Sequence, residues 1–328
     1  MLRIIFALLI SLNLQAQTEN YQIIIHGGAG NGLKAENYSE AQIAAFHHSL
    51  RQAIAIGDSA LQKGTATIEV VSLVIQQLEN DSLFNAGKGA VLTYEGRASL
   101  DASIMDGENG NAGAVAGLSC IKNPITAALA VLNNSPHVLL SGAGADTFSL
   151  QNGLTQVDPS YFITQRMKGI HESIKGHQGA LDSIRDFKMG TVGCVVRDRQ
   201  GNIAAGTSTG GMMNKRYGRV GDSPIIGAGT FASNATVGIS CTGHGEYFIR
   251  HAVAYQISAR YEFQGLSSQK AADTVLHEVL KPGAGDGGVI GIDKDGNFII
   301  SFNTAGMLRA FKQEGEAIQS YIFGEGEK

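Results

Sequence analysis

Hydrophobic positions recur every three or four residues in several stretches of the chain, which is typical of helices with one buried face. The clearest stretches are 43–54 and 67–80, and Ser39 with Gln42 reads as a capping box just before the first of them. Further helices are expected at 124–133, 246–260 and 267–280.

Short apolar runs bounded by glycine or polar residues indicate strands between these helices. The run 192–196, the turn 198–201 and the run 203–207 predict a hairpin, and 288–292 with 298–302 repeats that design. Other strands are expected at 21–25, 90–93, 98–105 and 113–119, with 26–30 as a glycine turn. Because strands and helices come in blocks rather than in strict alternation, we expect an antiparallel sheet stack with helices outside.

The segment 150–190 has a different character, because it is polar, carries scattered charges and shows weak periodicity. We interpret it as a mobile surface segment that ends at Gly190. Cleavage of the chain is tolerated in such segments.

The first residues have the pattern of a secretory signal peptide. Arg3 precedes an apolar run over 4–14, which is too short to span a bilayer, and small and polar residues follow. We expect cleavage after Ala16, which leaves 17–328 as a single domain in an exported, periplasmic or secreted protein. A buried first strand is the alternative interpretation of the run.

The composition excludes several classes of protein. With 43% hydrophobic and 16% charged residues, the chain of 328 residues can bury a large core and is not disordered. The net charge of −4 argues against a nucleic-acid partner and against an anionic membrane surface. Cys120, Cys194 and Cys241 have no regular spacing, so we expect small buried hydrophobic residues rather than a disulfide framework.

The candidate chemistry is centred on Thr191, which follows Gly190 at the start of an apolar strand. A threonine hydroxyl is a poor nucleophile unless a base removes its proton. If the chain breaks between these two residues, Thr191 gains a free α-amine that titrates near about 7.7–8.0 and can serve as that base. A plain junction between a turn and a strand is the structural alternative.

The alternation of side chains along the strand 191–196 separates the candidate groups. Thr191 and Gly193 share one face and Cys194 faces away, which weakens the cysteine as a competing nucleophile. We expect Gly193 to leave open space over the nucleophile for a substrate carbon. Thr209 ends the partner strand, so its hydroxyl can approach Thr191 and orient it or relay protons. A hydroxyl that satisfies the backbone of a turn is the alternative for Thr209.

Arg219 and Asp222 are candidates for binding a free amino acid. The guanidinium offers a planar fork for an α-carboxylate, and the carboxylate could accept an α-ammonium. Both stand on one glycine-containing loop, three residues apart. The structural alternative is a surface salt bridge, which contributes little to stability.

The segment 241–246 opens a predicted helix with two glycines, Gly243 and Gly245. Glycines there allow backbone N–H groups to face a ligand, and a helix N-terminus favours negative charge. The Thr242 hydroxyl and the Gly243 N–H group are therefore candidate oxyanion donors. An ordinary helix entry is the alternative.

The order and spacing of these motifs resemble the N-terminal-nucleophile asparaginases of the plant type, also called isoaspartyl peptidases. The resemblance covers nearly all of 21–312. The motifs that carry it are Gly190-Thr191-Val192-Gly193, Thr207-Ser208-Thr209-Gly210-Gly211, Gly218-Arg219-Val220-Gly221-Asp222-Ser223-Pro224, Thr242-Gly243-x-Gly245-Glu246, Ile25-His26-Gly27-Gly28-Ala29-Gly30, Phe84-Asn85-Ala86-Gly87-x-Gly89, Asp101-Ala102, Met105-Asp106-Gly107, Gly285-Asp286-Gly287-Gly288 and Asn303-Thr304-x-Gly306-Met307.

The resemblance implies an α+β fold of four layers, an αββα sandwich, assembled as a dimer of αβ units. It implies that Thr191 attacks the Gly190 carbonyl, so that an α chain (17–190) and a β chain (191–328) result. The freed Thr191 then hydrolyses L-asparagine or the β-aspartyl bond of isoaspartyl dipeptides, which are small-molecule substrates. Thr209, Thr242 and Gly243 would assist catalysis. The residues that would bind the substrate are Arg219, Asp222, Thr242, Gly243 and Gly245.

The resemblance also implies a structural sodium ion, and no cofactor for catalysis. The ion would be bound by hard backbone carbonyl oxygens of one loop. The matching positions are Leu78, Glu79, Asp81, Phe84, Ala86 and Lys88.

One departure from the family pattern concerns the leaving group. His244 stands where relatives often have threonine or serine, and it could alter which amides or peptides fit. Two alternative functions stay open at this point. One is a glycosylasparaginase-like amidase that cleaves the sugar–asparagine amide, and the other is an uncleaved relative that only binds an amino acid.

Overall fold

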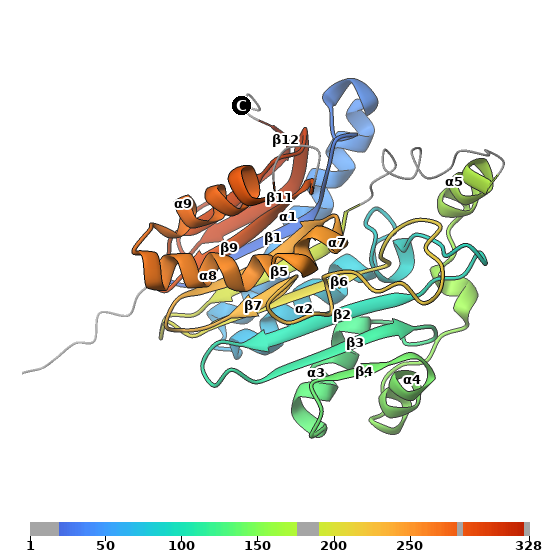
Figure 1. Cartoon of the computed structure of the whole chain (residues 1–328), viewed down its shortest axis with the longest axis horizontal. Helices are drawn as coiled ribbons and strands as arrows, with labels where there is room; N and C mark the ends of the chain where they lie inside the picture. Colours follow the sequence, from blue (N-terminus) through green and yellow to red (C-terminus); the bar gives the residue numbers. More distant parts are fainter. Residues whose placement is uncertain (1–19, 176–189, 281–284, 325–328) are drawn as a thin grey trace, which may run out of the picture.

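The computed structural model describes residues 20–175, 190–280 and 285–324. Two sheets stack face to face, and helices cover the outer face of each, so the layers run helix, sheet, sheet, helix (Figure 1). This is the four-layer α+β sandwich that the family resemblance implies, and it agrees with the sheet stack predicted from the residue pattern. The expected signal peptide at 1–16 lies outside the described residues.

The larger sheet has eight strands, and neighbours are antiparallel except for the pair β3 and β4. In spatial order its strands are β12 (Gln319–Phe323), β11 (Gly306–Gln313), β1 (Gln22–Gly30), β5 (Val192–Arg197), β6 (Ile203–Thr209), β2 (Leu100–Asp106), β3 (Ala112–Leu118) and β4 (Leu139–Ser141). The predicted hairpin of β5 and β6 therefore lies at the centre of this sheet.

The smaller sheet has four antiparallel strands and packs against β1, β5 and β6. In spatial order they are β10 (Phe298–Phe302), β9 (Gly287–Asp293), β8 (Val237–Gly243) and β7 (Thr230–Ala232). The hairpin of β9 and β10 was also predicted from the sequence and is confirmed.

Helices pack on the outer faces of the two sheets. The larger sheet carries α1 (Glu40–Gln62), α2 (Thr67–Glu79) and α3 (Pro124–Asn134), and the smaller one carries α8 (Val253–Gln264) and α9 (Ser268–Asp273) (Figure 1). The remaining helical segments are η1 (Ala35–Asn37), η2 (Gly87–Gly89), α4 (Gly142–Gln151), η3 (Pro159–Phe162), α5 (Gln165–Lys175), α7 (Gly245–Arg250) and the π-helical turn η4 (Thr274–Val279).

Successive side chains of a strand point to opposite faces of its sheet, so the buried side chains of these strands belong to three different cores. On β5, Cys194 belongs to the core under α1 and α2, whereas Val195 belongs to the core between the sheets. On β8, Cys241 belongs to the core under α8 and α9, so Thr242 faces the other sheet. The predicted separation of Cys194 from Thr191 is confirmed, and Cys241 is separated from Thr242 in the same way.

Several local predictions were right. Ser39 and Gln42 form both hydrogen bonds of the capping box that begins α1. The helices at 67–80 and 124–133 and the strands at 98–105 and 113–119 are present within a few residues of the expected bounds.

The predicted turn at 26–30 was wrong, because β1 continues through these residues to Gly30. The strand pairs with β11 along this stretch and absorbs its irregularity as a bulge between His26 and Gly28. Gly28 has φ +113, a conformation that glycine adopts without strain.

The predicted strand at 90–93 was also wrong, because its backbone groups bind loops instead of a neighbouring strand. The Val91 N–H group donates to the Asn85 side chain at 2.9 Å, and the Thr93 N–H group donates to the Arg97 carbonyl at 2.8 Å.

The expected helix at 246–260 is divided at Ala252, which has φ 45.

The segment 150–190 is more ordered than its polar sequence suggests. It contains α5, whose Met167 and Ile174 pack against Val91 and Leu92. Residues 176–189 lie outside the described part, so the expected mobility before Gly190 is untested there. Among the described residues, no helix has the length and apolar character needed to cross a membrane.

Gly193 is required for the close packing of the two sheets. A Cβ atom there would lie 1.9 Å from Ser240 Oγ and 2.3 Å from His26 Nε2. The predicted open space beside Thr191 is therefore filled by these two side chains, and that expectation was wrong.

We expect Gly193→Ala to lower the free energy of unfolding by about 1–3 kcal/mol, because the added methyl group must push apart well-packed strands. Urea denaturation measures this change. Gly144→Ala on α4 is the matched control, since a Cβ there meets nothing within 4 Å and alanine favours helix. Equal midpoints for the two variants would contradict the prediction.

Candidate active site

Thr191 precedes β5 by one residue and lies between the sheets, with 8% of its surface exposed. Its hydroxyl donates to Thr209 Oγ1 at 3.1 Å, and the Gly211 N–H group donates to the same oxygen at 3.0 Å. Thr209 ends β6, the hairpin partner of β5. The structure therefore brings the two threonines together as the hairpin argument predicts.

Thr242 reaches the same place from the smaller sheet. The Thr191 backbone N–H group donates to Thr242 Oγ1 at 3.2 Å, and the Ala29 N–H group donates to it at 3.4 Å. Thr191 is therefore contacted by hydroxyls of both sheets, one on its side-chain oxygen and one on its nitrogen. The nitrogen is the atom that would become a free amine after cleavage.

The peptide bond between Gly190 and Thr191 is held against β1. A Cβ on Gly190 would lie 2.0 Å from Gly28 Cα, and a Cβ on Gly28 would lie 2.3 Å from Gly190 Cα. Only two glycines permit this approach of two backbones. The bulge in β1 therefore presses the chain against the carbonyl that a nucleophile at Thr191 would attack.

Gly243 and Gly245 allow close approach at the start of α7. A Cβ on Gly243 would lie 2.5 Å from the Asp286 carbonyl oxygen. A Cβ on Gly245 would lie 2.8 Å from Arg219 Nη2 and 2.9 Å from the Asp222 backbone nitrogen. The structure thus brings Gly245 to the loop that carries the two predicted substrate-binding side chains.

Arg219 pairs with Glu246 rather than with Asp222. Its Nε and Nη2 atoms each donate to one Glu246 carboxylate oxygen at 2.9 Å. Glu246 belongs to the motif that begins at Thr242, but its role does not follow from the sequence. The pair holds the guanidinium fork at the entrance of α7, where about half of the Glu246 side chain is exposed.

Asp222 is buried, and its Oδ2 atom has no hydrogen-bond partner. Loss of hydration raises the pKa of this carboxyl to about 7, although the charge of Arg219 acts in the opposite direction. A buried oxygen without a partner suits the binding of a cationic group, because an ammonium would supply the missing donors.

A buried ion pair lies under the Thr209 loop. Lys215 Nζ is 3.5 Å from Asp101 Oδ2 and donates to the Ser99 carbonyl at 2.8 Å. Asp101 is paired in register with Thr209 across β2 and β6. Lys215 was not predicted as a site residue, because its only signal in the sequence is a position close to a glycine-rich strand end.

Asn85 links the loop after α2 to the end of β6. Its side chain donates to the Gly211 carbonyl at 2.8 Å, and its backbone carbonyl accepts from Gly210 N at 3.0 Å. Asn85 belongs to the motif that begins at Phe84, but the sequence does not predict these contacts. The residue fixes the backbone that carries Thr209.

The six residues predicted to bind sodium lie at the end of α2, in the tight loop that follows it and in η2. A Cβ on Gly87 would lie 2.4 Å from the Glu79 carbonyl oxygen, and one on Gly89 would lie 2.1 Å from the Phe84 carbonyl oxygen. The carbonyls of Leu78 and Ala86 also accept backbone N–H groups of the same loop. Among the described residues, no group of three or more His, Cys, Asp or Glu side chains could hold a metal ion.

Cys120 is only partly buried, so the expected burial is confirmed for Cys194 and Cys241 but was wrong for Cys120. Cys194 and Cys241 are buried in the two outer cores, and burial raises the pKa of each thiol well above its usual value. Neither thiol is therefore placed for nucleophilic chemistry at Thr191.

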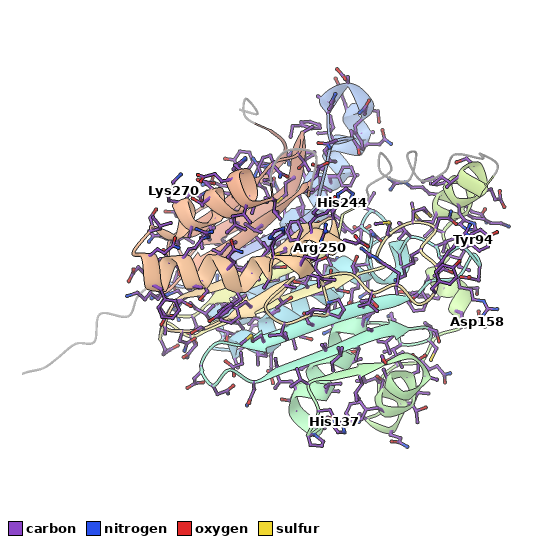
Figure 2. The ribbon with its side chains drawn as sticks, viewed as in Figure 1. Tyr94, His137, Asp158, His244, Arg250 and Lys270 are labelled. Atoms are coloured by element: carbon purple, nitrogen blue, oxygen red, sulfur yellow. The ribbon has the colours of Figure 1, made fainter. Side chains whose placement is uncertain are left out.

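His244 precedes α7 and Arg250 ends it (Figure 2). The His244 ring centroid lies 6.0 Å from that of Tyr247.

The burial of Asp222 makes the stability of the ligand-free protein depend on pH. Its pKa rises from 3.8 to about 7 on folding, so between these values the folded state holds a proton that the unfolded chain has released. This contribution is complete below about pH 4 and is lost as the pH rises through about 7. The total loss is about 4 kcal/mol.

We expect Asp222→Asn to remove this loss, so that the variant gains stability over the wild-type protein as the pH rises. Urea unfolding at a series of pH values measures the difference. Glu172→Gln on α5 is the control, because Glu172 is exposed. Parallel pH curves for Asp222→Asn and the wild-type protein would contradict the prediction.

Comparison with known proteins places this arrangement in a family. The family model named asparaginase matches residues 19–322. The isoaspartyl peptidases of Salmonella typhimurium and Escherichia coli are each 44% identical, covering 92% of this chain and 98% and 96% of their own lengths. A human isoaspartyl peptidase/L-asparaginase is 35% identical, covering 90% of this chain and 94% of its own length. The chain therefore belongs to the asparaginase family.

Proposed function

We propose that the protein is a self-cleaving threonine hydrolase that releases aspartate from isoaspartyl dipeptides and from L-asparagine. The observation that carries the proposal is the placement of Thr191, whose oxygen and nitrogen contact Thr209 and Thr242 directly after a glycine. The relatives named above, isoaspartyl peptidases and isoaspartyl peptidase/L-asparaginases, support the choice of substrates.

The first reaction is cleavage of the chain itself. The Thr191 hydroxyl attacks the Gly190 carbonyl carbon, the C–N bond breaks, and the proton of the hydroxyl passes to the departing nitrogen. Water then hydrolyses the resulting ester and restores the hydroxyl, which leaves a carboxylate on Gly190 and a free amine on Thr191. The contact of Gly190 with Gly28 supports this step, because it holds an uncrowded carbonyl in place.

The second reaction uses the freed amine as the base. The Thr191 hydroxyl attacks the β-carbonyl carbon of the aspartyl group, its proton passes to the amine and then to the leaving nitrogen, and an ester forms. Water attacks the ester and releases aspartate. We assign the Thr242 hydroxyl and the Gly243 N–H group to the developing oxyanion, and the Thr209 hydroxyl to the orientation of the nucleophile.

Arg219 and Asp222 bind the aspartyl group in this proposal. The guanidinium N–H groups that Glu246 does not use take the α-carboxylate, and the buried carboxylate of Asp222 takes the α-ammonium. Gly245 lets the loop and the start of α7 approach each other. Glu246 holds Arg219 in place, and His244 lies beside this group, on the side where we place the leaving amine.

We further propose a structural sodium ion, export and a dimer of αβ units. The carbonyls of Glu79 and Phe84, which lie against glycines that leave no room for a side chain, are suited to a hard cation. Export is supported by the apolar run at 4–14, and the dimer by the resemblance to the family.

The intact mass of the denatured protein tests the first reaction. We expect two chains from the wild-type protein, with the second beginning at Thr191. Thr191→Ala should remain a single chain and should lower kcat by about a thousandfold or more, because both reactions lose their nucleophile. Thr191→Ser retains a hydroxyl and an amine, so it should still cleave. A wild-type protein that stays uncut after long incubation would refute the proposal.

Substrate analogues test the binding roles. Arg219→Lys should raise KM for β-aspartyl dipeptides by about tenfold to a hundredfold, since a two-pronged charged contact becomes a single point charge.

Asp222→Asn should raise KM for L-asparagine but not for succinamate, which lacks the α-ammonium. The same rise in KM for both compounds would remove Asp222 from the ammonium site.

A further inference from the structure

A chain of buried polar side chains runs from Thr191 into the space between the sheets. His26 on β1 is fully buried, and its Nδ1 atom lies 2.9 Å from the Thr191 carbonyl oxygen. Its Nε2 atom lies 3.0 Å from Ser240 Oγ on β8. Ser240 Oγ in turn lies 2.7 Å from Thr207 Oγ1 on β6. Strands of both sheets therefore meet at one histidine ring.

The chemistry of the groups determines which ring nitrogen carries the proton. A carbonyl oxygen can only accept, so His26 must donate to Thr191 through an Nδ1–H group. In the neutral ring the Nε2 atom is then an acceptor, and Ser240 must donate its hydroxyl proton to it. Burial lowers the pKa of His26 to about 3, which keeps the ring neutral at any pH near neutrality.

The chain continues beyond Ser240 to the loop of Asp222. Thr207 Oγ1 accepts from the Thr230 hydroxyl at 2.6 Å and also lies 3.1 Å from the Gly229 carbonyl. Ser103 Oγ lies 2.8 Å from Thr230 Oγ1 and 2.6 Å from the Ser223 carbonyl. The hydroxyls therefore satisfy one another in an interior where an unpaired polar group is costly.

The contact with His26 restrains the Thr191 carbonyl, whereas Thr242 and Thr209 contact the Thr191 nitrogen and hydroxyl. Holding the carbonyl oxygen limits rotation about the Cα–C bond of Thr191, and so restrains the Cα atom that carries the nitrogen and the side chain. His26 lies on the same strand as Gly28, which contacts Gly190. One stretch of β1 therefore holds both sides of the bond that would be cleaved.

We propose that His26 is a positioning residue, held by Ser240 in its Nδ1–H tautomer, that orients Thr191 for self-cleavage and for turnover. The inference rests on the proposed role of Thr191 as the nucleophile. In this role His26 neither touches the substrate nor exchanges a proton during either reaction.

Two isosteric variants separate positioning from general support. Asparagine places an amide nitrogen near the position of Nδ1, whereas glutamine places one near Nε2. We expect His26→Asn to keep cleavage and kcat within about tenfold of the wild-type protein. We expect His26→Gln to slow cleavage and lower kcat by about a hundredfold, the effect of a small misplacement of a reacting group. KM for a β-aspartyl dipeptide should change little in both variants.

His48→Asn is the matched control, because His48 is exposed on α1, and it should behave as the wild-type protein. Equal cleavage and kcat for His26→Gln and the wild-type protein would overturn the inference. So would a rise in KM with kcat unchanged. If His26→Gln fails to fold, as judged by circular dichroism, the inference is tested by the activity of His26→Asn and by the measured tautomer of His26.

Nuclear magnetic resonance of protein labelled with ¹⁵N-histidine reads the tautomer directly. We expect His26 to have a protonated Nδ1 and an unprotonated Nε2 at neutral pH, in the wild-type protein and in Thr191→Ala. A proton on Nε2 would overturn the inference. Since this readout needs no catalysis, it separates failure of the inference from failure of the proposed function, which the intact mass decides.

Discussion

The close approach of the two sheets at Gly193 is the constraint on which the rest of the site depends. Because residue 193 has no side chain, His26 from β1 and Ser240 from β8 can meet beside β5. A larger residue would separate the strands that carry Thr191 and Thr242, which lie in different sheets and must come within hydrogen-bond distance. A second glycine contact, between Gly28 and Gly190, then sets the position of the bond that we propose is cleaved.

The space between the sheets changes in character from one end to the other. Ile24, Val195 and Ile290 form an apolar core at one end. Next comes the chain of hydroxyls around His26, and beyond it lie the ion pair of Lys215 with Asp101 and the carboxyl of Asp222. On β1, for example, a step of two residues from Ile24 to His26 moves from the apolar core to the buried polar groups. The interior polar groups are costly unless paired, so the oxygen of Asp222 without a partner marks a place that ligand binding would complete.

Much of the fold could be predicted from local patterns, for identifiable reasons. The capping box of α1 and the two hairpins depend on residues close together in the sequence, and all three are present. The continuation of β1 through 26–30 could not be predicted, because its glycines signal a turn locally and only the pairing with β11 makes them a strand. The segment 90–93 shows the reverse. Its apolar residues suggested a strand, but the Val91 N–H group, which a neighbouring strand would need, donates to the Asn85 side chain instead.

The sequence by itself determined which groups are available and which face each of them takes. The glycine before Thr191 and the alternation that turns Cys194 away are properties of neighbouring residues, so they follow from strand geometry alone. Only the tertiary structure decided the partners: Glu246 rather than Asp222 for Arg219, and His26 and Ser240 in the space beside Thr191. These contacts join residues far apart in the chain, and their distances depend on how two sheets stack. No local pattern encodes that separation, because it arises from the packing of all the side chains between the sheets.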